Sequence, residues 1–201
     1  MKILLISGSR NPDGQTARAG NALLDGAAEA GAETEKIFLP SLKIERCRQC
    51  EDTGWGLCAD EGRCVIEDDF ASVFEKVKAA DVVIFASPVY LWEISESLFE
   101  FCSRMRRICF HCGKYDTVNN KPAVGLAVAG GGGSGSIRTL FQLEQILLFS
   151  GFDVVDMYPV RRQNLEAKLP QLRIAGRWLA TKPNSGGPYV LYPPQPLNPL
   201  D

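Results

Sequence analysis

The regular alternation of short apolar runs with helix-like stretches is the feature that most constrains how this chain folds. The apolar runs predict strands at residues 2–6, 33–39, 82–86, 122–129 and 152–157. Amphipathic or small-residue patterns between and after them predict helices near residues 16–30, 68–80, 93–108, 136–150 and 165–180. Five short, mostly apolar strands separated by helices predict an α/β fold, with a parallel sheet covered on both faces.

The rules for connections between parallel strands then limit the possible strand orders. Right-handed crossovers leave few arrangements of five parallel strands, and they favour a flavodoxin-like three-layer sandwich with strand order 2-1-3-4-5. We expect one domain over residues 1–180, with a cysteine-rich insertion at 40–67. Residues 181–201 hold six of the 12 prolines, so this segment should form an extended tail. The tail is either disordered or an arm that packs on its own or a neighbouring subunit.

Charge and hydropathy exclude several classes of partner. The net charge is −2, which leaves no surplus of cations for the phosphates of a nucleic acid. The longest apolar runs are far shorter than the roughly 20 residues that a membrane span needs, so no membrane partner is expected. The apolar amino-terminal stretch is also too short for a signal peptide, and we interpret it as a buried strand. These observations predict a cytoplasmic protein.

Three loops at the predicted carboxyl ends of strands are suited to ligand binding, because ligands of open parallel sheets collect at that edge. The first loop combines glycines and polar groups at a helix start, where free N–H groups and the helix dipole attract a phosphate. The second is aromatic and apolar, as a planar ring requires, and the third is a glycine run that a flat ligand can approach. The candidate residues are Ser9, Arg10, Gln15 and Thr16; Pro88, Val89, Tyr90, Leu91 and Trp92; and Gly131, Gly132 and Gly133.

The insertion supplies a second candidate site, made of four cysteines close in sequence. Four thiolates can ligate one zinc ion or one iron–sulfur cluster, and unligated or disulfide-linked cysteines are the third alternative. The candidate ligands are Cys47, Cys50, Cys58 and Cys64. A further group, Cys109, His111 and Cys112, is a small metal or redox motif, or else Cys102 and Cys109 are simply core thiols.

Together the loops resemble the NADPH-dependent FMN reductase family, and especially its iron–sulfur flavoproteins. The resemblance covers about residues 1–160, and it rests on the first loop, on Pro88-Val89-Tyr90 and on the glycine run after the fourth strand. Gln15 stands where the family usually has asparagine. The resemblance implies that the first loop holds the FMN phosphate, that residues 88–92 meet the isoalloxazine and ribityl groups, and that residues 131–133 lie along the ring edge. It also implies a homodimer or homotetramer.

The cysteine segment resembles the cluster segment of these flavoproteins only in part. Their last cysteine is followed by Val or Ile and paired Asp, as Cys64 is here by Val65, Ile66 and the pair Asp68-Asp69. Thr53 stands where their third cysteine would be, so Cys58 would have to supply that ligand from a longer loop. A [4Fe–4S] cluster at this position would relay electrons between a one-electron donor and the flavin.

The leading functional hypothesis is therefore an FMN-dependent oxidoreductase. NAD(P)H or ferredoxin would donate electrons, and a quinone, free flavin or other small molecule would accept them. One alternative is an electron-transfer flavoprotein that turns over no small substrate. Another is a protein whose first loop binds a different ligand or none. The sequence holds one histidine, which disfavours a histidine-based acid–base mechanism, and flavin chemistry does not need one.

Overall fold

Five parallel strands form one sheet in the order β2-β1-β3-β4-β5, which confirms the predicted topology. The computed structural model describes residues 1–110, 118 and 120–184. The strands are β1 (Lys2–Ser7), β2 (Glu33–Phe38), β3 (Val82–Pro88), β4 (Pro122–Ala129) and β5 (Asp153–Arg161). β3 and β4 are buried along their whole length, as expected of central strands that have helices on both faces.

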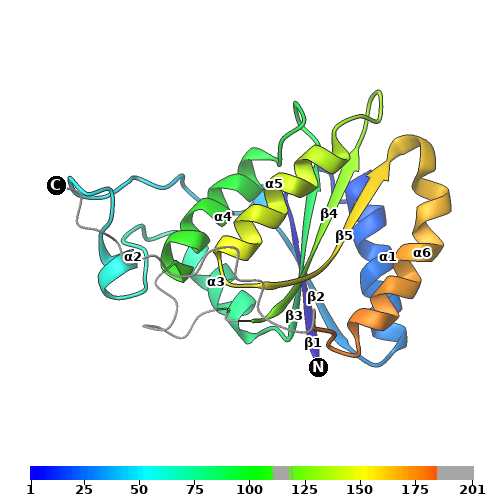
Figure 1. The fold of residues 1–201 in the computed structure, drawn as a ribbon, viewed down its shortest axis with the longest axis horizontal. Helices are drawn as coiled ribbons and strands as arrows, with labels where there is room; N and C mark the ends of the chain where they lie inside the picture. Colours follow the sequence, from blue (N-terminus) through cyan, green and yellow to red (C-terminus); the bar gives the residue numbers. More distant parts are fainter. Residues whose placement is uncertain (111–117, 119, 185–201) are drawn as a thin grey trace.

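Helices cover both faces of the sheet, as the sequence predicts. Figure 1 shows α1 (Gln15–Glu29) and α6 (Leu165–Leu179) on one face, and α3 (Phe70–Ala79), α4 (Glu96–Cys109) and α5 (Ser136–Phe149) on the other. Each face has its own cluster of buried apolar side chains. The shorter elements are η1 (Leu39–Ser41), α2 (Leu57–Asp60) and η2 (Arg162–Asn164). The three layers of a flavodoxin-like sandwich are therefore present.

The last strand is longer than its apolar pattern indicates. β5 continues to Arg161 and includes Pro159, which pairs with Ala127 of β4. Proline lacks the N–H group that a central strand would donate on its second side, but β5 is at the edge of the sheet and has a neighbour on one side only. The apolar run predicted a strand that ended at residue 157, before Tyr158 and Pro159.

The insertion leaves the sandwich after η1 and returns at α3. Between residues 42 and 56 the chain forms neither helix nor strand, and the short helix α2 then lies beyond α4, at the left of Figure 1. Sequence analysis did not predict α2. Residues 185–201, which include most of the predicted tail, lie outside the described residues. Within the described ranges, no helix combines the length and the apolar character needed to cross a bilayer.

Candidate functional site

A cavity of about 670 Å³ opens at the carboxyl ends of β1, β3 and β4, within the usual size range of ligand sites. It gathers every predicted residue of the three loops except Arg10. Its lining consists of Ser9, Asn11, Gly14, Gln15, Thr16, Pro88, Val89, Tyr90, Leu91, Trp92, Val128, Gly130, Gly131, Gly132, Gly133 and Ser134. The three loops, far apart in sequence, therefore form one site at the edge where open parallel sheets bind ligands.

The first loop presents the start of α1 to this cavity. Gly14 is the N-cap, and no side chain caps the first turn within the described structure. The loop is shaped by Asn11, whose Oδ1 accepts a hydrogen bond from the N–H of Asp13 at 3.0 Å, and whose carbonyl accepts one from Ser9 Oγ at 3.3 Å. Sequence analysis missed Asn11, although an Asn two residues before an Asp is a common turn signal. The arrangement leaves amides at the start of α1 available to an anion.

Arg10 lies elsewhere than its loop neighbours. Its side chain lines an adjacent cavity of about 510 Å³, together with Glu96 and Glu100 of α4. Tyr90 lines both cavities, so the two adjoin at that residue. The expectation that Arg10 joins Ser9, Gln15 and Thr16 around one phosphate therefore lacks the support of a shared cavity.

The second loop contains a strained turn. Tyr90 and Glu93 exchange two backbone hydrogen bonds, at 3.2 and 2.9 Å, around Leu91 and Trp92. Both central residues have positive φ, 50° and 65°, a conformation in which turns of this kind favour Gly or Asn. Such strain costs about 1–3 kcal/mol per residue and concentrates at functional sites. The turn presents Leu91, 87% exposed, and the indole of Trp92 beside the cavity.

Trp92 connects the second loop to the third. Its Nε1 donates a hydrogen bond to Ser134 Oγ at 3.3 Å. Gly135 has φ of 93°, and a Cβ atom there would overlap Trp92 and lie 3.0 Å from Val89 Cγ1. A Cβ atom at Gly132 would instead meet nothing within 4 Å, because this residue faces open space at the cavity. In the glycine run, Gly135 therefore packs closely against Trp92 and Val89, whereas Gly132 leaves room for a ligand.

These two glycines give a matched pair of variants. Gly135→Ala should destabilise the protein by about 1–3 kcal/mol, because it adds strain at positive φ and displaces Trp92. Gly132→Ala should leave the stability of the ligand-free protein nearly unchanged, but it should weaken binding of the FMN that the loop resemblance implies, because the added methyl group would occupy space at the cavity. Urea denaturation and FMN titration of both variants measure the two effects. Equal loss of stability in both would contradict this assignment.

The four cysteines of the insertion line a second, smaller cavity. Cys47, Cys50, Cys58 and Cys64 all carry free thiols, and none of the cysteines within the described ranges forms a disulfide. Gly56 packs so closely that a Cβ atom there would lie 2.9 Å from Cys50 Cβ. The structure therefore brings together all four predicted ligands and contains no disulfide between them.

The cysteine cavity offers four thiols in a small space. Four thiols are a donor set for a four-iron cluster or for one zinc ion, and no group of three or more His, Cys, Asp or Glu side chains among the described residues is arranged to hold a metal ion. The cavity has a volume of about 20 Å³, room for about one water molecule. A bound cluster would therefore require the cysteines that line the cavity to move apart.

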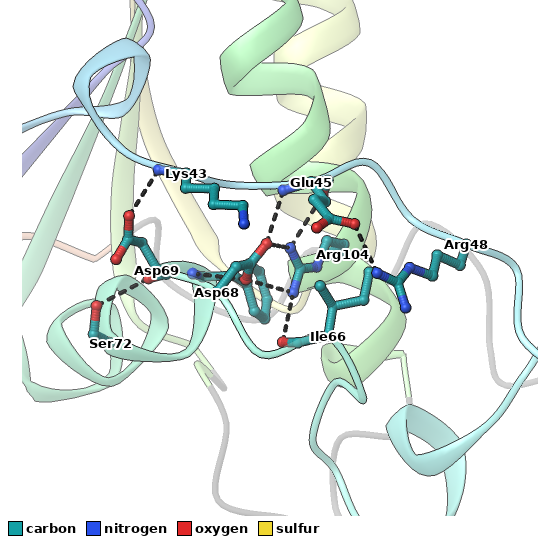
Figure 2. A network of polar contacts seen from close by, with 9 residues as sticks. Lys43, Glu45, Arg48, Ile66, Asp68, Asp69, Ser72 and Arg104 are labelled. Atoms are coloured by element: carbon teal, nitrogen blue, oxygen red, sulfur yellow. Dashed lines mark hydrogen bonds and ion pairs between the residues drawn. The ribbon is translucent and has the colours of Figure 1, made fainter.

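A buried ion pair lies behind the cysteines. The carboxylate of Asp68 and the guanidinium of Arg104 are 2.6 Å apart at Oδ2 and Nη1, with side chains 0% and 1% exposed (Figure 2). Arg104 also lines the cysteine cavity. Sequence analysis noted Asp68 only as part of the segment after Cys64, and no sequence signal indicated Arg104. Only the packing of α4 against the insertion brings these residues together.

The second cysteine group is partly explained by the core. Cys102 and Cys109 are fully buried in the apolar cluster beneath α4, which confirms the interpretation of these two as core thiols. Burial raises the pKa of the Cys102 thiol well above its usual value, and the nearby Cys109 adds to this, so Cys102 stays neutral and unreactive. His111 and Cys112 lie outside the described residues.

The fold is that of a flavodoxin-like protein with a cavity at the carboxyl edge of its sheet, and sequence comparison identifies its family. The sequence model of the family described as NADPH-dependent FMN reductase matches residues 1–165. The chain belongs to this family. It is 34% identical over 157 residues to an iron–sulfur flavoprotein of Methanocaldococcus jannaschii, covering 77% of this chain and 76% of that protein. An iron–sulfur flavoprotein of Methanosarcina thermophila is 32% identical over 158 residues, 77% of each chain.

Solved structures agree on the fold. The NAD(P)H:quinone oxidoreductase from Methanothermobacter marburgensis superposes with a TM-score of 0.65 at 18% identity, covering 89% of this chain and 96% of that one. A flavone reductase gives a TM-score of 0.63 at 22% identity, covering 90% of this chain and 62% of the other. At these identities the likeness shows the flavodoxin-like fold alone. The family model and the two flavoproteins confirm the resemblance that the loop motifs indicate.

Proposed function

We propose that the protein is an FMN-dependent oxidoreductase that takes electrons from NAD(P)H or ferredoxin and passes them to a quinone, a flavin or another small-molecule acceptor. The observation that carries this proposal is the single cavity lined by all three predicted loops. Its volume, the polar groups at the start of α1 and the aromatic side chains Tyr90 and Trp92 suit a phosphorylated planar ligand. Membership of the FMN reductase family supports the same cofactor.

Each loop has a role in this proposal. Ser9, Gln15 and Thr16 would hold the phosphate with the amides at the start of α1, since hydrogen bonds and the helix dipole both favour an anion there. The residues from Pro88 to Trp92 would bind the ring and the ribityl chain, and the open glycines 131–133 would lie along the ring edge. Bound FMN would supply the redox chemistry itself, accepting a hydride or single electrons and giving them up again.

The cysteine cavity supports a second cofactor. Cys47, Cys50, Cys58 and Cys64 would ligate a [4Fe–4S] cluster, for which four converging thiols are the usual donor set. The two curated relatives that carry the name iron–sulfur flavoprotein support this proposal. The same observation favours the alternative function, an electron-transfer flavoprotein that relays electrons between ferredoxin and FMN without turning over a small substrate.

We expect protein purified under strict anaerobiosis to show flavin absorption and about four irons per chain. An absorption spectrum with iron and sulfide analysis tests both cofactors in one preparation. Absence of flavin even after addition of FMN would reject the proposed function, and fewer than about two irons per chain would reject the cluster. Steady-state oxidation of NADPH and of NADH then separates the enzyme from the carrier, because a carrier would be reduced by ferredoxin but turn over neither nucleotide.

We propose that the protein forms a homodimer or a homotetramer and that it is located in the cytoplasm. The exposed apolar side chains Ile137 and Phe141 of α5 and Phe99 of α4 support self-association, because such surface is commonly covered by another subunit. Light scattering on the flavin-loaded protein measures the oligomeric state.

A further inference from the structure

We propose that Arg104 is a positioning residue of the cysteine site: Asp68 fixes its guanidinium beside Cys64, where the positive charge raises the reduction potential of the bound cluster. This inference rests on the proposed function, since it needs the cluster to be present. It concerns a residue of α4, outside the insertion that carries the ligands. Three features support it: Arg104 is rigidly held, its partner Asp68 helps to join the two ends of the cysteine segment, and the charged residues that line the cavity are all positive.

Arg104 is held rigidly. Its Nη1 and Nη2 donate to the two oxygens of Asp68 at 2.6 and 2.9 Å, in the paired geometry that fixes a guanidinium plane. Nη1 also donates to the Glu45 carbonyl at 3.0 Å, and the guanidinium lies 4.2 Å from the ring centre of Phe70. With a side chain 1% exposed, Arg104 has one fixed position rather than a range of them.

Asp68 of this ion pair and the neighbouring Asp69 also hold the two ends of the cysteine segment together (Figure 2). Asp68 Oδ2 accepts the N–H of Glu45 at 2.8 Å, two residues before Cys47. Asp69 Oδ2 accepts the N–H of Lys43 at 2.7 Å, and the N–H of Asp69 donates to the Lys43 carbonyl at 3.0 Å. The chain entering the cysteine segment and the chain leaving it are thereby joined across Arg104.

The charges that face the cavity are all positive. Its charged lining residues are Arg48, Arg104 and Arg107, whereas Asp68 does not line it. Arg104 lines the cavity together with Cys64, and its Nε, which is fully buried, has no hydrogen-bond partner within the described residues. An unpaired buried donor is costly, and a negatively charged sulfur of the site is an acceptor that would satisfy it. Arg104 therefore presents a fixed positive charge at the ligand site.

The sign of the effect follows from electrostatics. Reduction adds one electron, and thus one negative charge, to a cluster that four thiolates already make anionic. A fixed cation in a water-poor environment stabilises the reduced form more than the oxidised form, so it raises the potential. Arg48 has the same formal charge, but its side chain is 58% exposed and paired with Glu45, so water and salt screen it. The two arginines therefore differ in burial rather than in charge.

The test is a dithionite titration of the anaerobically purified, flavin-loaded protein, followed by electron paramagnetic resonance of the cluster. Arg104→Gln should lower the equilibrium constant for one-electron reduction at least tenfold, which corresponds to 59 mV. Arg104→Lys retains the charge and should recover part of the loss. Arg48→Gln is the matched control and should change the constant less than threefold. FMN affinity, measured in parallel, reports whether the fold is intact, because Arg104 is not part of the flavin cavity.

A second variant covers the case in which Arg104→Gln loses its iron. The double substitution Arg104→Met with Asp68→Asn removes both charges at once, which proteins tolerate far better than one uncompensated buried ion. Because the negative charge of Asp68 is lost together with the positive charge of Arg104, the double variant should lower the constant in the same direction but by less than Arg104→Gln. A decrease smaller than tenfold in Arg104→Gln, or no decrease in the double variant where Arg104→Gln holds no cluster, would overturn the role of Arg104, and so would loss of iron from all three Arg104 variants, including Arg104→Lys. Fewer than about two irons in the wild-type protein would instead overturn the proposed cluster itself.

Discussion

Asp68→Ala should destabilise the folded protein by about 3–5 kcal/mol, the usual cost of removing one partner from a buried ion pair. The substitution leaves the guanidinium of Arg104 buried without its carboxylate. It also removes the acceptor for the N–H groups of Glu45 and Phe70, at 2.8 and 3.1 Å. Since the Asp68–Arg104 pair joins the insertion to α4, the cysteine segment should open first.

Thermal and urea denaturation measure this effect, and for a chain of this size the midpoint should fall on the order of 10 °C. The control is Glu166→Gln, which breaks the ion pair with Arg18 on exposed surface, where both side chains are about half or more exposed. That variant should lose less than about 1 kcal/mol. Similar losses in the two variants would contradict the structural importance of the buried pair.

The same pair predicts a pH dependence. Burial by itself would raise the pKa of Asp68, but the hydrogen bonds from Arg104 and from the N–H groups of Glu45 and Phe70 outweigh it and hold the pKa below its usual 3.8. A carboxylate with a lowered folded-state pKa stabilises the protein fully above the unfolded value, and this stabilisation is lost as the pH falls through the folded value. Stability should therefore decline below about pH 4 in the wild type, and this component should be missing in Asp68→Asn.

Thr16→Val should weaken FMN binding at least tenfold. Thr16 is 4% exposed at the start of α1 and lines the larger cavity. Each hydrogen bond to a charged phosphate contributes about 1.5–3 kcal/mol, and about 1.4 kcal/mol is a factor of ten in the dissociation constant. Arg10→Ala should have a smaller effect, because Arg10 lines the neighbouring cavity, and the double variant should bind FMN no better than Thr16→Val.

Titration of the apoprotein by flavin fluorescence gives these dissociation constants. Thr139→Val is a matched control: its hydroxyl is also buried in a helix, has no hydrogen-bond partner among the described residues and lies outside the cavity. We expect its FMN affinity to equal that of the wild type. An unchanged dissociation constant in Thr16→Val would mean that the phosphate is held elsewhere. A large effect of Arg10→Ala alone would indicate that the neighbouring cavity holds the phosphate.

Much of the fold followed from local patterns in the sequence. Apolar runs and the helical spacing of Phe70, Val73, Phe74 and Val77 mark elements whose periodicity is set by the backbone itself, so order and layers were predictable. The residues at which helices and strands begin and end were less predictable. Pro159 is accommodated in β5 because that strand is at the edge, and α4 begins at Glu96 rather than near residue 93 because residues 90–93 form a tight turn.

The sequence by itself determined the strand order, the three loops that line the main cavity and the four clustered cysteines, because each depends on short-range spacing or on rules that all parallel sheets obey. Tertiary structure alone separated Arg10 from the main cavity, seated Trp92 against Gly135, and brought Arg104 to Asp68 and Cys64. Those contacts join residues tens of positions apart. The Trp92 contact depends on how the loops after β3 and β4 meet, and the Arg104 contacts depend on how α4 packs against the insertion; no local pattern encodes either.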